Sequence, residues 1–418
     1  KVRASYGSLG NGNIDPYSFQ ELFKIKQSSL VLNGIRPQYT GQPAVIPLGL
    51  TWEKSTTLNL GLDFAFLSNR LQFSGDIYQR KTTDMFTVGM SLPAVFGTDV
   101  PKGNYADLTT KGFELSVSWR DQFQLASKPF NYEVRFTLAD YQSTIDKYNN
   151  PEKKLGDDYY YEGMKVGEIW GYETEGFFTS QADIDSHAKQ PYFYAGATAG
   201  QWLPGDIKFK DLNGDGVIDY GNNTVDNPGD QKIIGNSEPR FIYGINLSGD
   251  WNNFFVSAFF QGVGKQDWWP GSEASYFWGM YNRPYNDMPK SHLGNIWTEE
   301  NPNTYFPRLR GYSSEEPYAE LNLKQTRYLQ NIAYIRMKNI QLGYTLPKSF
   351  ISKLRMQNAK VYVSGENLWS WSPFYKYSKD LDVEAVRGSD RDLTEGTSGN
   401  GYSYPILKSV SFGLSVTF

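Results

Sequence analysis

Residues 58–66 read LNLGLDFAF, in which every second position carries a large apolar side chain. Successive side chains of a β-strand point to opposite faces, so this segment is predicted to be a strand with one apolar and one mainly polar face. The same alternation recurs at 113–119 (FELSVSW), 132–138 (YEVRFTL) and 410–418 (VSFGLSVTF). The dominant period of the chain is therefore two, and an all-β fold is predicted.

About ten segments carry this pattern, and several exceed the ~5–6 residues of an average strand. Their lengths match the ~9–11 residues with which a tilted strand crosses a bilayer. The predicted strands are roughly 1–10, 50–66, 71–86, 103–120, 130–145, 239–251, 254–263, 334–346, 359–369 and 405–418.

The connections between these strands alternate between long and short. The long ones are 11–49, 87–102, 146–238, 264–333 and 370–404, and the short ones are 67–70, 121–129, 252–253 and 347–358. Short periplasmic turns and long extracellular loops are typical of outer-membrane barrels. We therefore predict an antiparallel transmembrane β-barrel with long extracellular loops.

The two faces of the predicted strands have different environments in such a barrel. A charge at the bilayer midplane costs a few kcal/mol, so Asp63, Glu114 and Arg135 are expected to face the lumen. The apolar sets, which include Leu115 and Phe136, are expected to face lipid. A closed barrel also satisfies every backbone hydrogen bond, as a lipid environment requires.

The composition of the 418 residues excludes several classes of function. The absence of cysteine rules out disulfides and thiolate chemistry, and the only two histidines, His187 and His292, leave little material for a His-rich metal site or a Ser-His-Asp triad. A net charge of −4 without a basic block gives no sign of nucleic-acid binding. We predict that the chain is not an enzyme.

One loop segment has the spacing of a calcium site. Oxygen ligands stand at positions 1, 3, 5 and 9, with glycine at position 6 and a backbone carbonyl at position 7; these residues are Asp211, Asn213, Asp215, Asp219, Gly216 and Val217. Asn222 occupies position 12, where a bidentate Glu is expected, so Asp226, Asp230 or water would have to complete the shell. The alternative is a loop held by Asx-turns without metal.

Aromatic residues gather in the predicted loops. Their flat faces suit stacking against sugar rings, and they equally suit packing within long loops, partner contact or a membrane girdle. Trp268, Trp269 and Trp278 are the strongest candidates for a ligand-facing cluster.

Several segments resemble the SusC/RagA-like TonB-dependent transporters, and they occur in the same order over nearly the whole chain. These segments are LTWEKSTTLNLGLDFAF (50–66), IYQRKTTDM (77–85), GDIKFKDLNGDGVID (205–219), IWTEENPNTYFPRL (296–309), YIRMKNIQLGYTLPKS (334–349) and KVYVSGENLWSW (360–371).

This resemblance implies a barrel of about 22 strands in the outer membrane of a Gram-negative-type cell, with an N-terminal plug in its lumen. It also implies coupling to the TonB complex and a SusD-like surface lipoprotein over the extracellular face. Residues 1–418 would form the C-terminal part of that barrel, without the plug and the first half. The strand at 1–10 is then expected to pair with a strand N-terminal to it, and 405–418 with the first strand of the other half.

The function that follows is energy-dependent import of an oligomeric nutrient, with a glycan as the preferred substrate. Three alternatives remain open at this point. They are the same transporter carrying oligopeptides, a passive porin, and a soluble all-β carbohydrate-active enzyme, the last of which the loop asymmetry disfavours.

Overall fold

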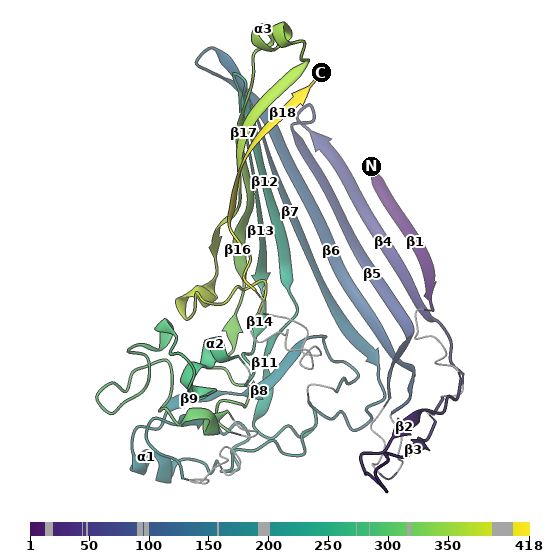
Figure 1. Ribbon diagram of the computed structural model, residues 1–418, viewed down its shortest axis with the longest axis vertical. Coiled ribbons are helices and arrows are strands. Elements are labelled where there is room, and N and C mark those ends of the chain that lie inside the picture. The colour runs from purple at the N-terminus through teal and green to yellow at the C-terminus, as the bar shows by residue number, and fades with distance from the viewer. Residues whose placement is uncertain are drawn as a thin grey trace.

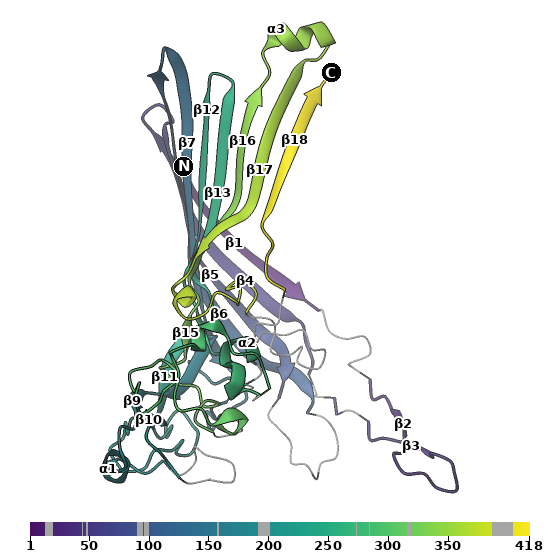
Figure 2. The same ribbon diagram turned by 60° about the vertical axis from the view of Figure 1, so that its left-hand side comes forward.

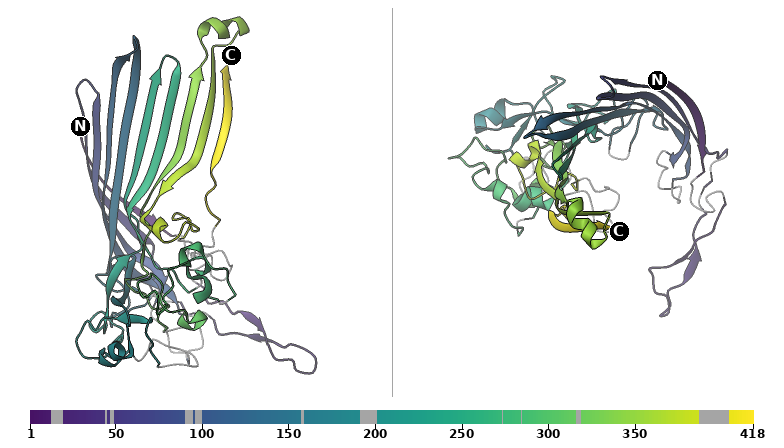
Figure 3. Two further views of the ribbon diagram at one scale, coloured as in Figure 1. Left: turned by 90° about the vertical axis from the view of Figure 1, so that its left-hand side faces the viewer. Right: turned by 90° about the horizontal axis from the view of Figure 1, so that it is seen from above.

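The computed structural model describes residues 1–12, 20–43, 45–46, 49–89, 95, 100–156, 159–190, 201–272, 274–283, 285–315, 319–386 and 404–418. Its main feature is one antiparallel sheet of ten strands, which curves into a wall (Figure 1, Figure 3). Each strand pairs with the next wall strand along the chain. In order, these are β1 (Val2–Asn11), β4 (Glu53–Phe66), β5 (Leu71–Val88), β6 (Lys102–Leu125), β7 (Lys128–Lys147), β12 (Arg240–Trp251), β13 (Phe254–Lys265), β16 (Tyr334–Thr345), β17 (Asn358–Trp371) and β18 (Ser409–Thr417).

All ten predicted strands are confirmed as strands of this wall, and the main differences are in their ends. The turn predicted at 121–129 shrinks to Ala126 and Ser127, because β6 and β7 continue pairing to Leu125 and Lys128. Ala126 and Ser127 have φ of 47° and 60°, and Asn252 and Asn253 of the β12–β13 turn have 47° and 71°. Two-residue turns with positive φ match the twist of the strands that they join.

The two faces of the wall differ as the alternation predicts. On one face the large apolar side chains of neighbouring strands lie opposite each other and stay exposed, as Leu60 does beside Ile77. On the other face Arg3 reaches across two strands, donating to Asp63 at 2.8 and 2.9 Å and to Asp76 at 2.7 and 2.8 Å. An exposed apolar face and a charged opposite face are what a wall between lipid and a wet lumen requires.

The wall is an open arc when seen from above (Figure 3). Its two edges are β1 and β18, and in the described part of the chain these two strands do not pair with each other. The residues described here therefore do not form a closed ten-stranded barrel.

The sorting of the connections is also confirmed. The short turns and α3 (Lys348–Ile351) lie at one end of the wall, and the long connections lie at the other (Figure 1, Figure 2). Residues 191–200 and 387–403, which belong to two of the predicted loops, lie outside the described residues. Among the helices that are described, none is long and apolar enough to cross a membrane.

The long connections carry short elements that the strand pattern does not predict. The strands are β2 (Ile25–Gln27), β3 (Gln38–Thr40), β8 (Glu168–Tyr172), β9 (Thr174–Phe177), β10 (Ile207–Phe209), β11 (Gln231–Asn236), β14 (Asp267–Trp268) and β15 (Gln330–Asn331). The helices are α1 (Gln181–Ser186) and α2 (Ser275–Trp278), with 3₁₀ turns at Gly279–Tyr281, Lys290–His292, Gly311–Ser314 and Pro373–Lys376. A further 3₁₀ turn, Ser352–Leu354, follows α3 in the short connection before β17.

The main apolar core of the described chain lies in these connections. Tyr172 and Ile207 follow β7, Phe277 follows β13, and Phe374 and Val386 follow β17, yet all five belong to one buried cluster. Three loops that are far apart in the sequence thus fold together into one unit. We call it the loop lobe and define it as the described residues of 148–238, 266–333 and 372–386.

Candidate functional site

The predicted tryptophan cluster forms part of the core of the loop lobe. Trp268 and Trp278 are 5% and 0% exposed, and Trp278 Nε1 donates to the backbone oxygens of Pro270 and Gly271 at 3.1 Å. The Trp278 ring also packs edge-on against Trp269 and Phe277. These contacts occupy the ring faces that a sugar would need.

Tertiary packing buries the rings of Trp268 and Trp278, which favours the alternative of packing within long loops, and ligand contact by these two residues stays a prediction. Trp269 is only partly buried, at the margin of the same cluster. Its predicted ligand contact remains a prediction.

The acidic loop of 211–219 is closed by bonds between its own side chains and backbone. Asp211 accepts from the N–H groups of Gly214 and Gly216 at 2.6 and 2.9 Å, and Asp215 accepts from that of Val217 at 2.8 Å. Asn213 Oδ1 accepts from the N–H of Asp215 at 2.9 Å. These are the Asx-turn bonds of the metal-free alternative.

Asp230 is the remote carboxylate that reaches this loop. It is fully buried and accepts from the backbone N–H of Leu212 at 2.7 Å and of Asp219 at 2.9 Å. Burial raises the pKa of Asp230, and the nearby charge of Asp211 acts in the same direction. Within the part of the chain that the structure describes, no three His, Cys, Asp or Glu side chains gather as metal ligands do. Calcium at Asp211, Asn213, Asp215, Val217 and Asp219 stays a prediction.

A second acidic group lies deep in the lobe and has no counterpart in the sequence-based predictions. Arg310 forms a two-pronged ion pair with Asp206, with 2.8 Å between Arg310 Nε and Asp206 Oδ1. Glu320 accepts from the N–H of Ile207 at 2.9 Å. Burial, followed by the charge of Asp206, raises the pKa of Glu320 to about 8.

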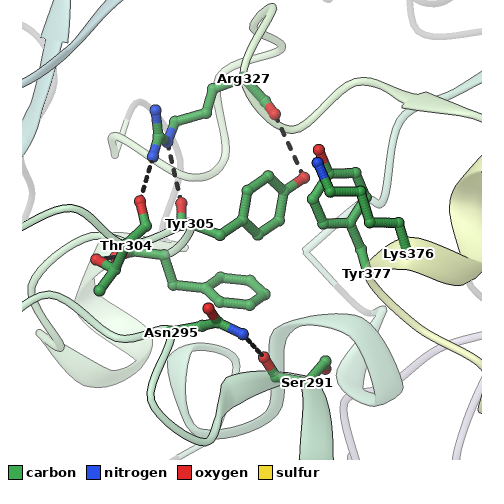
Figure 4. A pocket seen from close by; sticks show the side chains of 8 residues that line it. Ser291, Asn295, Thr304, Tyr305, Arg327, Lys376 and Tyr377 are labelled. Carbon is green, nitrogen blue, oxygen red and sulfur yellow. Dashed lines mark hydrogen bonds between the residues drawn. The ribbon is translucent and has the colours of Figure 1, made fainter.

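A pocket of about 490 Å³ opens where the loop between β13 and β16 meets the loop after β17 (Figure 4). The rings of Tyr305 and Tyr377 stack in it with centroids 4.1 Å apart and planes 17° apart. Arg327 donates to the backbone oxygens of Thr304 and Tyr305 at 2.6 and 3.0 Å, which fixes its position. The other residues lining the pocket are Ser291, Asn295, Phe306 and Lys376.

No sequence spacing predicts this pocket, because its residues come from four separate segments. The local signal that exists is the pairing of a cation with an aromatic residue at Arg327–Tyr328 and Lys376–Tyr377. Such pairs are common, so they become informative only once the fold brings them together.

Comparison with known proteins shows which β-barrel proteins the wall is similar to. The family described as "TonB dependent receptor-like, beta-barrel" matches residues 1–202, which include β1 and β4 to β7. The whole chain aligns with TonB-dependent receptor P3 of Formosa agariphila at 28% identity and covers 39% of that protein. The chain is therefore similar to TonB-dependent receptors over its whole length, and its first 202 residues match their β-barrel domain. It is also 23% identical to TonB-dependent receptor SusC of Bacteroides thetaiotaomicron, of which it covers 37%.

Solved structures share the fold of this chain. The structure titled "Structure of the RagAB peptide transporter" superposes with a TM-score of 0.73 at 20% identity, over all of this chain and 40% of that one. The prediction of a SusC/RagA-like barrel is confirmed. The matched proteins are receptors and transporters rather than enzymes, as predicted. The chain spans about two fifths of the length of the curated relatives that it matches.

Proposed function

We propose that residues 1–418 form barrel wall and extracellular loops of an outer-membrane importer of oligomeric nutrients, with glycans as the substrate class. The observation that carries this proposal is the ten-stranded wall of a TonB-dependent receptor, with its long connections gathered into a lobe at one end. A rigid lobe at the mouth of a barrel is placed to capture a substrate before it enters the lumen. Nothing in this role requires a covalent step.

The remaining parts of the transporter are proposed by analogy with the SusC/RagA-like receptors. A SusD-like lipoprotein would cover the loop lobe from outside, and the remaining half of the barrel would pair with the edges β1 and β18. A plug in the lumen would be moved by the TonB complex. The charged face of the wall, where Arg3 joins Asp63 and Asp76, suits contact with such a plug or with water.

The proposed glycan substrate is supported by the pocket beside Tyr305. Stacked aromatic rings next to amide and hydroxyl side chains, here Asn295 and Ser291, suit a sugar with apolar ring faces and polar edges. The second candidate is oligopeptide import, and it is favoured by the likeness to a structure titled as a peptide transporter. The proposed wall, plug and lipoprotein are the same for both candidate substrates.

The test is uptake by cells that carry the full transporter gene, by cells with that gene deleted, and by cells that carry the gene in a TonB-uncoupled background. Fluorescent oligosaccharides and oligopeptides of equal length are supplied separately. The proposal expects oligosaccharide uptake that requires both the gene and TonB. Peptide uptake alone would replace the substrate class, and TonB-independent uptake with high conductance in planar bilayers would make the protein a passive porin.

A further inference from the structure

The pocket beside Tyr305 differs from the rest of the loop lobe in its charge. Of the eight described residues that line it, Arg327 and Lys376 are cations and none is an acid. The chain as a whole carries a net charge of −4, so an unbalanced positive pocket is not a general property of its surface.

Several cations elsewhere in the lobe are neutralised by carboxylates. Lys208 lies 2.9 Å from Asp183, Lys210 lies 3.1 Å from Glu173, and Lys232 pairs with the same glutamate. The deeply buried Arg310 is paired with Asp206. Each of these four cations therefore has its charge balanced by an acid of the lobe itself.

Arg327 and Lys376 have no ion pair with a carboxylate in the described structure, and both line one pocket. Arg327 is held by two backbone carbonyls and lies 4.1 Å above the Phe177 ring, with no carboxylate beside it. Lys376 is exposed, and its Nζ lies 5.2 Å from the centroid of Tyr377 without an acidic partner. Fixed cations that lack an internal anion are free to bind an external one through charge-assisted hydrogen bonds.

The uncharged residues that line the pocket indicate what kind of molecule would bear the anionic group. The stacked Tyr305 and Tyr377 supply apolar ring surface, and Asn295 and Ser291 face them across the pocket (Figure 4). About 490 Å³ is the volume of a small-ligand site and holds one or two sugar rings. A small inorganic anion would leave most of this space and all of the aromatic surface unused.

We propose that this pocket is a subsite for an anionic sugar residue, bearing a carboxylate or a sulfate, within the substrate of the transporter. The inference rests on the glycan import proposed above and narrows it to acidic glycans. Arg327 and Lys376 bind the anionic group, and the Tyr305–Tyr377 pair contacts the ring that carries it. Substitution of Lys376 removes one charge from the pocket without disturbing the lobe, because its side chain, unlike that of Arg327, donates no described hydrogen bond to the backbone.

The experiment measures binding by calorimetry to the full transporter, purified together with its lipoprotein. The probes are tetragalacturonate, a sulfated carrageenan tetrasaccharide, neutral maltotetraose and tetra-aspartate. The variant is Lys376→Gln, and the matched control is Lys379→Gln, an exposed lysine three residues further along that does not line the pocket.

One or both acidic tetrasaccharides are expected to bind more tightly than maltotetraose, and added salt should weaken that binding. Lys376→Gln should raise the Kd of the acidic sugar about tenfold, as expected for one charge-assisted hydrogen bond, and Lys379→Gln should leave it unchanged. A preference for tetragalacturonate identifies the group as a carboxylate, and a preference for the carrageenan fragment identifies it as a sulfate.

Equal binding of maltotetraose, or no effect of Lys376→Gln, would overturn the anionic subsite and leave glycan import intact. Binding of tetra-aspartate alone would overturn both this inference and the glycan proposal. Binding of no probe would also overturn the inference, and the uptake assay described above would then decide on glycan import separately.

Discussion

Glu320→Gln is expected to remove a pH dependence from the stability of the loop lobe. Glu320 is 1% exposed, and its pKa rises from the ordinary 4.5 to about 8 because burial and the neighbouring Asp206 disfavour its ionised form. At about 1.36 kcal/mol per pH unit, this difference corresponds to about 5 kcal/mol. The folded lobe holds the proton more tightly than the unfolded one, so stability is lost as the pH rises from about 4.5 to about 8.

Hydrogen exchange followed by mass spectrometry on the full transporter measures this effect. The amides around Ile207 and Glu320 report the free energy of local opening once intrinsic exchange rates are corrected for pH. In the natural protein that free energy should fall between pH 5 and pH 8, by up to about 4 kcal/mol. In Glu320→Gln it should stay level, because glutamine does not ionise.

The matched control is Glu299→Gln, which changes an exposed glutamate of the same loop and should keep the pH dependence of the natural protein. An opening free energy that does not change with pH in the natural protein would refute the reasoning. So would an equal slope in Glu320→Gln, because the proton would then be bound elsewhere.

Three further outcomes are expected. Leu115→Arg should cost about 2–4 kcal/mol at a mid-membrane position, and Ser116→Arg on the opposite face much less; equal costs in urea refolding into lipid vesicles would contradict the assigned faces. Trp278→Ala should destabilise the loop lobe by about 3–5 kcal/mol through the cavity it leaves, seen as faster amide exchange across the lobe, and unchanged exchange would contradict its structural role. We propose that calcium binds at 211–219, so that calcium should slow exchange there and Asp215→Ala should abolish the effect; no response of the natural protein to calcium would end this proposal.

The wall was predictable from sequence because its determinants are local. Alternation such as Val134, Phe136 and Leu138 against Glu133 and Arg135 assigns both the strand and its two faces, whatever its neighbours are. Antiparallel strands joined by tight turns then pair in chain order. Strand ends were less certain, because pairing at 121–129 depends on the partner strand as well as on local composition.

The loop lobe was not predictable in the same way. Whether Trp278 faces a ligand or a core depends on Trp269, Tyr328 and Phe277 meeting it in space, and no period in the sequence encodes those contacts. The pocket beside Tyr305 has the same origin, since Arg327 and Tyr377 are 50 positions apart in the chain. The acidic loop at 211–219 was recognisable in the sequence because its oxygen-bearing side chains lie within nine consecutive residues.

The shared core of the loop lobe also limits how receptors of this kind can be re-engineered. Tyr172, Phe277 and Phe374 come from three different loops and pack in one apolar cluster. Grafting any single loop from a relative would place foreign side chains against two unchanged surfaces, with gaps or clashes between them. To change substrate preference by grafting, all three loops would have to be replaced together. Natural recombination that exchanges one loop would create the same packing mismatch. The loops at the mouth of the barrel are therefore expected to diversify by point substitutions, each compensated by a substitution in a neighbouring loop.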